Sequence, residues 1–305
     1  MENKFTFVVV PTFRETDKIT TLLASFSQVK ARDIKILIAN GNPGDETSTY
    51  IRTLHDDRVQ ELSGHPSLFW SGLVNLGLRH ILEHETGQEF VIIMNADVDF
   101  DGDVITPLLN KARSTPNAQL AAVTVGDGQV ISSGVKVVSW LLTLNRHPLA
   151  GTLPERLPED KLIPVDFLPT RCTLIPFEYV KKAGLISEKQ LPHYGGDNEY
   201  TNRVRMLGCS PYIYKGVQVR VDAKNTGTDV FHKEIPIGRR IRSLFSIKST
   251  ANPVYRIRLI RMIYPWYAWP SAMFLYVLRS ILEALLGGRG IKAFIRRKES
   301  GFSGS

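Results

Sequence analysis

Two groups of residues in this 305-residue chain have types and spacings that could do chemistry. The first is "VIIMNADVDFDGD" (91–103), in which an apolar run brings Asn95, Asp97 and Asp99 to its polar end. Side chains at positions i and i+2 of an extended segment share a face. Carboxylate and amide oxygens suit a hard cation such as Mg²⁺ or Mn²⁺, and such an ion would clamp a diphosphate. The alternative is a polar turn after a strand.

The second group is "HYGGDNEYTNRVRMLG" (193–208), where Asp197 follows two glycines at the start of a stretch with helical spacing. Aspartate is a favoured N-cap because its carboxylate accepts hydrogen bonds from the first backbone N–H groups of a helix. The helix dipole also stabilises the ionised carboxylate, and an ionised carboxylate can take a proton from a substrate. From the residues alone, both a cap and a catalytic base remain open.

Alternating strands and helices would position these residues. The apolar patterns predict strands over 5–10, 34–39, 89–94, 120–125 and 212–223, and helices over 16–29, 71–84 and 102–112. Such alternation indicates βαβ units and a mostly parallel sheet with helices on both faces. Ligands of such sheets bind at the carboxyl ends of the strands, which is where residues 12–15, Asn40 and 95–99 fall. The Pro-rich stretch 140–170 is predicted to be a long substrate-binding loop.

The composition is that of an ordinary globular protein, with 43% hydrophobic and 22% charged residues. Two cysteines are too few for a disulfide framework, so a reduced, cytosolic setting is expected. The start "MENKFTFVVVP" has no basic segment followed by a long apolar one, and we therefore expect no signal peptide there.

The basic residues gather toward the C-terminus. Residues 233–298 hold fourteen Lys or Arg and two acidic residues, a net charge of +12, which leaves −4 of the chain's +8 for the rest. An uncharged run of 17 residues, 262–278, contains two prolines and a cluster of Tyr and Trp. Together these favour an interfacial helix or hairpin on an anionic membrane over a spanning helix. The alternatives are packing on the rest of the chain or a homodimer interface, whereas nucleic acid is disfavoured because the aromatics are not interleaved with basic residues.

Six segments in one order give the chain a family resemblance: "VVVPTFRET", "ILIANGNPGDETS", "FWSGLVNLGLRHI", "VIIMNADVDF", "RCTLIPFEYVKKAGLI" and "LPHYGGDNEYTNRVRMLG". Over about residues 5–225 the chain resembles the family 2 inverting glycosyltransferases with a GT-A fold, particularly bacterial enzymes that build surface polysaccharides. The resemblance implies a GT-A catalytic domain over 1–228, with a Rossmann-like nucleotide-binding half. Residues 229–305 would be a basic, aromatic-rich helical extension that associates with membrane.

The resemblance also implies roles for individual residues. Asp197 matches the general base, and Asp97 matches the last carboxylate of the family's metal motif. The acidic cluster adds Asp99 as a second predicted ligand for Mn²⁺ or Mg²⁺. Donor-binding residues would be Pro11, Thr12, Phe13, Glu15, Asn75, Asn95 and Asp97, joined by Asn40 because Ala39 stands where the family often has a base-reading aspartate. Arg171, His193 and Tyr194 are predicted to bind the acceptor. Besides Ala39, Asn95 and Gly196 depart from the acidic residues usual in the family.

We therefore expect a metal-dependent inverting glycosyltransferase. It would move a sugar from a nucleotide-diphosphate donor to a hydroxyl of a saccharide or polyprenyl-linked saccharide, as a peripheral protein on the cytoplasmic face of a bacterial plasma membrane. A sugar nucleotidyltransferase is disfavoured because "PTFRET" (11–16) lacks the glycines of that class's phosphate loop. A non-catalytic membrane-binding protein on a degenerate transferase scaffold is the remaining alternative, kept open by Ala39, Asn95 and Gly196.

Overall fold

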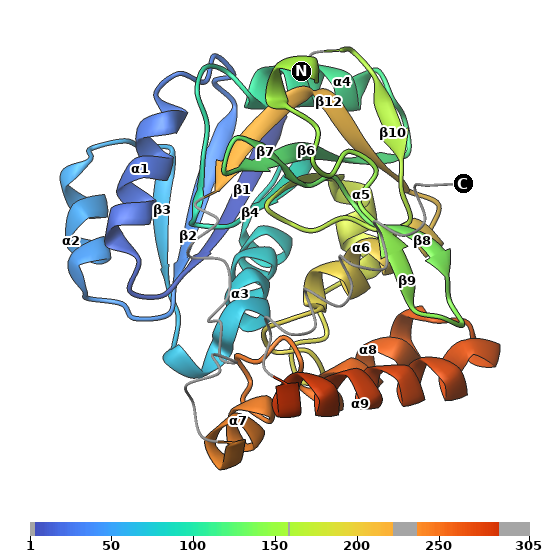
Figure 1. Ribbon diagram of the computed structural model, residues 1–305. Coiled ribbons are helices and arrows are strands. Elements are labelled where there is room, and N and C mark those ends of the chain that lie inside the picture. The colour runs from blue at the N-terminus through green and yellow to red at the C-terminus, as the bar shows by residue number, and fades with distance from the viewer. Residues whose placement is uncertain (1–3, 158, 222–236, 287–305) are drawn as a thin grey trace. The chain divides into compact units, whose positions relative to one another are not determined.

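The computed structural model describes residues 4–157, 159–221 and 237–286 (Figure 1). The described residues form two compact units. The first unit comprises residues up to 137, 145–192 and 196–221, and the second comprises 138–144, 193–195 and 237–286. The domain boundary predicted at residues 228 and 229 lies outside the described residues.

A ten-stranded mixed sheet organises the first unit, in the order β10-β12-β6-β11-β4-β1-β2-β3, with β5 on β12 and β7 on β6. Pairing is parallel along β4-β1-β2-β3 and between β6 and β12, while β11 runs antiparallel between β4 and β6. The strands are β1 (Phe5–Thr12), β2 (Ile34–Asn40), β3 (Val59–Ser63), β4 (Gln88–Met94), β5 (Val98–Asp99), β6 (Ala118–Gly126), β7 (Gln129–Ser132), β10 (Leu162–Pro164), β11 (Cys172–Pro176) and β12 (Ser210–Val221). Two short strands, β8 (Lys136–Ser139) and β9 (Leu144–Arg146), pair separately.

Helices cover the sheet and make up most of the second unit. The first unit contains α1 (Thr16–Phe26), α2 (Glu46–Thr53), η1 (Pro66–Leu68), α3 (Phe69–His84), α4 (Ile105–Arg113), η2 (Pro154–Arg156), α5 (Phe177–Ala183) and α6 (Gly196–Met206). The second contains α7 (Ile237–Leu244), α8 (Pro253–Ile263), η4 (Trp266–Ala268) and α9 (Trp269–Leu286). The stretch 140–170, predicted to be a loop, therefore also contains short strand and 3₁₀ segments.

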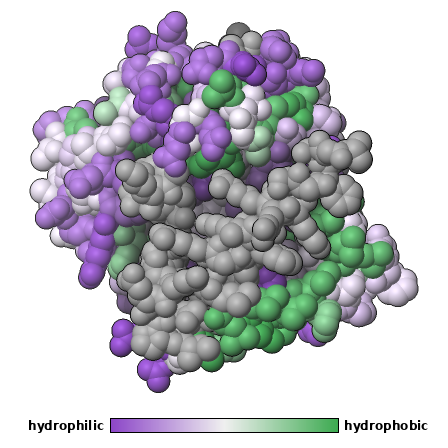
Figure 2. Space-filling view, viewed as in Figure 1, coloured by the Kyte–Doolittle hydropathy of each residue, from purple (hydrophilic) through white to green (hydrophobic). Residues whose placement is uncertain are grey.

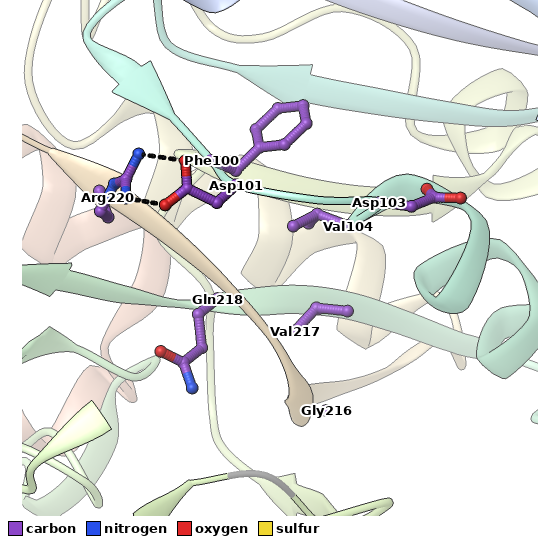
Figure 3. A pocket seen from close by; sticks show the side chains of 8 residues that line it. All are labelled: Phe100, Asp101, Asp103, Val104, Gly216, Val217, Gln218 and Arg220. Carbon is purple, nitrogen blue, oxygen red and sulfur yellow. Dashed lines mark hydrogen bonds and ion pairs between the residues drawn. The ribbon is translucent and has the colours of Figure 1, made fainter. Parts of the chain in front are cut away.

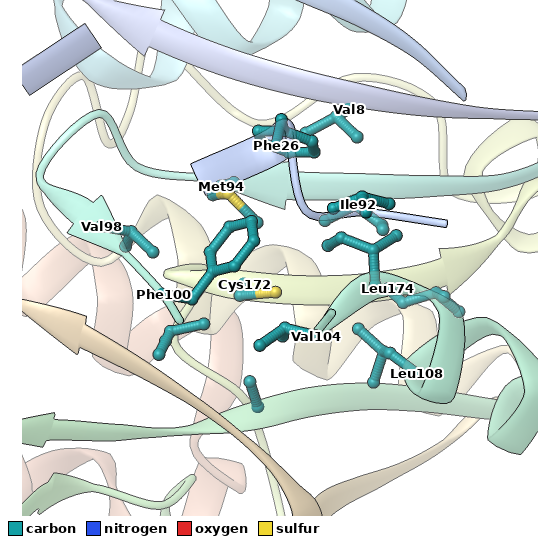
Figure 4. Close-up of a cluster of buried hydrophobic side chains, with 14 of the residues drawn as sticks. Val8, Phe26, Ile92, Met94, Val98, Phe100, Val104, Leu108, Cys172 and Leu174 are labelled. Atoms are coloured by element: carbon teal, nitrogen blue, oxygen red, sulfur yellow. The ribbon is translucent and has the colours of Figure 1, made fainter. Parts of the chain in front are cut away.

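The central strands β1, β2, β4 and β6 are buried on both faces, and most of their residues are apolar. In β1, Val8 and Val10 belong to the core that includes α1 and α4, while Phe7 and Val9 belong to the core with α3, α5 and α6. The first of these cores is drawn in Figure 4. On the other face α3 lies very close to β1, since a Cβ at Gly77 would come within 2.5 Å of a Val9 methyl group. Residues that follow β1, β2 and β4 are thereby held at one edge of a rigid sheet.

The helices of the second unit are joined by side-chain hydrogen bonds. Ser280 Oγ donates to the carbonyl of Ala251 (2.8 Å), and Trp269 Nε1 donates to the carbonyl of Tyr264 (3.0 Å). Within the described ranges, no helix is both long enough and apolar enough to cross a membrane.

Candidate functional site

The loops after β1 and β2 are tied together at the sheet edge. Thr12 pairs with Asn40 in the strand register, and the Gly41 amide donates to the Thr12 carbonyl (2.9 Å). Thr12 Oγ1 is buried and has no hydrogen-bond partner among the described residues. Such a hydroxyl, placed after a strand end, is suited to receive a ligand group. Glu15, further along the same loop, is paired with Lys18 at 2.6 Å.

Asn40 is fully buried and its side chain is used within the protein. Its Nδ2 donates to Glu61 (2.8 Å) and Asp45 (3.1 Å), and its Oδ1 accepts from the Asn42 amide (2.9 Å). Burial raises the pKa of Asp45, but hydrogen bonds from Asn40 and the Ser48 amide outweigh that effect and lower it. We interpret Asn40 as the residue that holds the loop after β2, with no exposed surface left for a donor.

The turn after β4 contains the predicted metal ligand Asp97. Trp70 Nε1 donates to Asn95 Oδ1 (3.0 Å), and the Asn95 amide donates to the Arg171 carbonyl (3.3 Å), which fixes this turn. Asp97 lies in this turn and is half-buried. Carboxylate oxygens are ligands that hard divalent cations such as Mg²⁺ and Mn²⁺ prefer. Asp97 therefore fits the predicted metal.

Asp99 is engaged elsewhere. It lies in β5, which pairs with β12, and its carboxylate accepts from Arg220 Nε at 2.6 Å. Because Ala96 and Asp97 form a turn between β4 and β5, the alternation expected of one continuous extended segment does not carry through to Asp99. Arg220 thus engages one of the two predicted ligands, Asp99. Among the residues that the structure describes, no group of three or more His, Cys, Asp or Glu side chains could hold a metal.

A pocket of about 290 Å³ lies beside this ion pair (Figure 3). Arg220 of β12 reaches Asp101 across it, and the paired carboxylates raise the pKa of the Arg220 guanidinium. The lining residues are Phe100, Asp101, Asp103, Val104, Gly216, Val217, Gln218 and Arg220. None of the predicted catalytic or ligand-binding residues lines this pocket.

Asp197 lies in the first turn of α6, which begins one residue earlier at Gly196. It is therefore inside the helix rather than at an N-cap. Its Oδ1 accepts from the Asn198 amide (2.8 Å), and the side chain is half-buried. The first turn favours a negative side chain through the helix dipole, so the carboxylate is placed where its ionised form is stabilised.

Helix α6 is fixed by buried polar contacts that the sequence did not reveal. Glu199 and Arg203 form a bidentate ion pair with N–O distances of 2.8 and 2.9 Å, and Arg203 also donates to the carbonyls of Ala183 and Leu185. Thr201 exchanges two hydrogen bonds of 3.0 Å with the backbone of Leu168. The i, i+4 spacing of Glu199 and Arg203 was the available sequence signal. These contacts position Asp197.

Helix α3 clamps the segment that leads into α6. Asn75, which is 1% exposed, donates to the Ile186 carbonyl (2.9 Å) and to Glu188 (2.7 Å), and accepts from the Ile186 amide (2.8 Å). Ser71 Oγ donates to the Leu191 carbonyl (2.5 Å). A Cβ at Gly196 would meet Ser71 Oγ at 2.6 Å, which explains the glycine beside Asp197. Asn75, predicted to bind donor, is instead occupied by this clamp.

The predicted acceptor residues fall in different units. Arg171 is half-buried in the first unit, next to β11. His193 and Tyr194 belong to the second unit, with ring centroids 4.5 Å apart in an edge-on arrangement. Burial, aided by the charge of Lys248, lowers the pKa of His193 to about 4, so its imidazole is neutral near pH 7. Burial also raises the pKa of Tyr194.

The sequence of this chain is similar to known glycosyltransferases. The family model described as "Glycosyl transferase family 2" matches residues 7–167. A galactofuranosyl glycosyltransferase of Leishmania donovani is 25% identical over 224 residues, which are 66% of this chain and 50% of that protein. The chain thus spans about half the length of this curated relative.

Solved structures share the fold at low sequence identity. S. aureus TarS 1–349 in complex with UDP matches with a TM-score of 0.54 and 12% identity, covering 94% of this chain and 75% of that one. GalNAc-T7 with UDP, GalNAc and Mn²⁺ matches with a TM-score of 0.59 and 12% identity, covering 88% and 54%. These likenesses confirm the predicted GT-A type α/β fold with its mostly parallel central sheet.

Proposed function

Since this chain belongs to glycosyl transferase family 2, we propose that it transfers a sugar from a nucleotide-diphosphate sugar to an acceptor hydroxyl, with inversion at the anomeric carbon. The observation that supports this most directly is the placement of Asp197 in the first turn of α6, braced by α3 and by the Glu199–Arg203 pair. The match to the Leishmania donovani relative covers 50% of that protein.

Asp197 would act as the general base. Its carboxylate takes the proton of the acceptor hydroxyl as that oxygen attacks the anomeric carbon. The bond from the anomeric carbon to the diphosphate oxygen breaks, and its electron pair leaves with the nucleotide diphosphate. Attack opposite to the leaving group inverts the configuration, through a transition state of oxocarbenium character.

The donor would lie along the edge formed by the loops after β1, β2 and β4. Thr12 Oγ1 is the buried hydroxyl there that lacks a protein partner among the described residues. Pro11, Phe13 and Glu15 would complete the binding site for the nucleoside. The side-chain amide of Asn95, which accepts a hydrogen bond from Trp70, would face the donor. Asp97 would hold Mn²⁺ or Mg²⁺, which when bound stabilises negative charge on the diphosphate.

The names of the similar proteins suggest which substrates to test first. Both solved structures contain UDP, and the curated relative is named as a galactofuranosyl glycosyltransferase. We therefore propose a UDP-sugar donor, with UDP-galactofuranose as the first candidate. We also propose that the acceptor is a saccharide or lipid-linked saccharide, and that Arg171, His193 and Tyr194 bind it. The reaction would belong to bacterial surface-polysaccharide synthesis.

Release of UDP tests the proposal. The protein is incubated with a panel of UDP-sugars and Mn²⁺, with and without saccharide acceptors, and UDP is quantified over time. We expect one donor to release UDP faster when its acceptor is present, and NMR of the product to show an inverted anomeric configuration. Failure of every donor to bind or to release UDP would instead favour a non-catalytic protein on a transferase scaffold.

A further inference from the structure

Several side chains of the second unit are buried or packed against other residues of the same unit. In α8 and α9, Ile260, Ile263, Ala272 and Ser280 are buried. Trp140, from the segment 138–144 of the same unit, packs edge-on against Tyr264 with ring centroids 4.7 Å apart. In α9, the buried Ala272 and Ser280 lie on one side of the helix, and the exposed apolar side chains lie on the other.

Helix α9 exposes a continuous apolar stripe. Its members recur at spacings of three or four residues, which places them on one side of a helix; they are Phe274, Leu278, Ile281, Leu282 and Leu285. Phe274 is 67% exposed. Figure 2, viewed as in Figure 1, shows a band of hydrophobic surface along α9. Exposed apolar surfaces of this kind mark interaction sites.

Two exposed aromatic side chains precede the stripe. Trp266, which is 78% exposed, and Tyr267 lie in η4, directly before α9. Tryptophan and tyrosine concentrate where a membrane meets water, because their rings are apolar and their N–H or O–H groups can stay hydrated. Their position at one end of the stripe is the arrangement expected at such an interface.

The charge of this unit selects an anionic partner. Residues 237–286 contain eight Lys or Arg and one acidic residue. Arg239, Arg242, Lys248, Arg261 and Arg279 are exposed. A second copy docked through the same face would bring two such units together, and like charges would oppose that contact. An anionic lipid surface would instead attract each basic residue near it by about 1 kcal/mol.

We propose that this face, defined as Trp266, Tyr267 and the α9 stripe, inserts into the interfacial region of a membrane that contains anionic lipid. The helix lies in the plane of the surface, with its apolar side among the acyl chains and the basic residues near the headgroups. This binding does not depend on catalysis. Its use, which is to bring the active site to a lipid-linked acceptor at high effective concentration, rests on the proposed function.

Co-sedimentation of the full chain with vesicles tests the proposal, and it needs no enzyme activity. The vesicles are phosphatidylcholine alone or phosphatidylcholine with phosphatidylglycerol, at about 0.1 M and about 1 M salt, where the Debye length falls from about 10 Å to about 3 Å. We expect binding to the anionic vesicles that weakens at high salt and leaves an apolar remainder. A protein that stays in the supernatant with anionic vesicles at low salt overturns the proposal.

A pair of variants tests whether the α9 stripe itself, rather than any exposed apolar side chain, causes binding to the vesicles. Phe274→Ser should lower partitioning onto anionic vesicles about tenfold, since burial of a phenylalanine side chain changes an equilibrium by that order. Met206→Ser removes a side chain that is 72% exposed on α6 of the other unit, and should leave partitioning unchanged. Equal binding by both variants contradicts the assignment. So does a dimer in sedimentation equilibrium that Phe274→Ser dissociates, because the stripe would then bind a second copy.

Discussion

Replacing Asn75 with alanine distinguishes the role that the structure gives it from the donor contact predicted by the sequence. The change removes three hydrogen bonds, to the Ile186 carbonyl, the Ile186 amide and Glu188. Each bond is worth about 1 kcal/mol net, and buried groups left without a partner add to the cost. We expect the free energy of unfolding to fall by about 3 kcal/mol, which for a domain of this size lowers Tm by about 6–12 °C.

Thermal melting and UDP titration of the same samples provide the assay. Asn75→Ala should melt early yet bind UDP with nearly the affinity of the wild type, because its side chain is buried in the clamp. Transfer should fall, since the clamped segment leads into α6 and Asp197. Asn110→Ala, at an exposed position of α4, is the matched control and should melt like the wild type. A variant with unchanged Tm and lost UDP binding would refute the clamp and restore a donor contact.

The remaining predictions concern the metal ligand and the response to pH. Asp97→Ala should abolish the gain in UDP affinity that Mn²⁺ provides in calorimetry, whereas Asp99→Asn should keep that gain, because Asp99 is paired with Arg220; the reverse result would exchange the two roles. Burial lowers the pKa of His193 from 6.5 to about 4, so stability is full above pH 6.5 and is lost as the pH falls toward 4, by about 2 kcal/mol at pH 5. In His193→Gln, the free energy of unfolding measured with urea should change less between pH 6.5 and pH 4. Burial also lowers the pKa of His147, so an unchanged pH dependence in this variant would point to His147 as the main cause.

Many of the helices and strands were predictable because the spacing of apolar residues within each segment indicates its secondary structure. The β-branched runs of β1, β2 and β4 and the apolar spacing of α3 match the predicted segments to within a few residues. The insertion of antiparallel β11 between β4 and β6 was not predictable, since strand order depends on contacts distant in sequence. Strand β3 and helix α2 were missed because "VQELS" and "ETSTYIRT" are largely polar and lack a clear apolar period.

The site shows the same division between local and distant information. Asp197 was identifiable because glycines and a helical pattern surround it in the sequence. The burial of Asn75 was not, because its partners Ile186 and Glu188 lie 111 and 113 residues away. The same holds for the hydrogen bond from Trp70 to Asn95, which we expected to bind the donor, because these two residues lie 25 positions apart. Residue type and order therefore indicated candidate reactive groups, while the contacts that support them required the structure.

The turnover of Asp197→Asn tests the central claim most directly. Asparagine can keep the hydrogen bond from the Asn198 amide but cannot take a proton, so fold and UDP affinity should be retained. Loss of a general base typically lowers the rate by about 10²–10⁴-fold. The account predicts a Tm and UDP affinity close to those of the wild type, together with a loss of sugar transfer of at least about 10²-fold. Transfer at the wild-type rate by a folded, UDP-binding variant would contradict it and reduce Asp197 to a structural residue of α6.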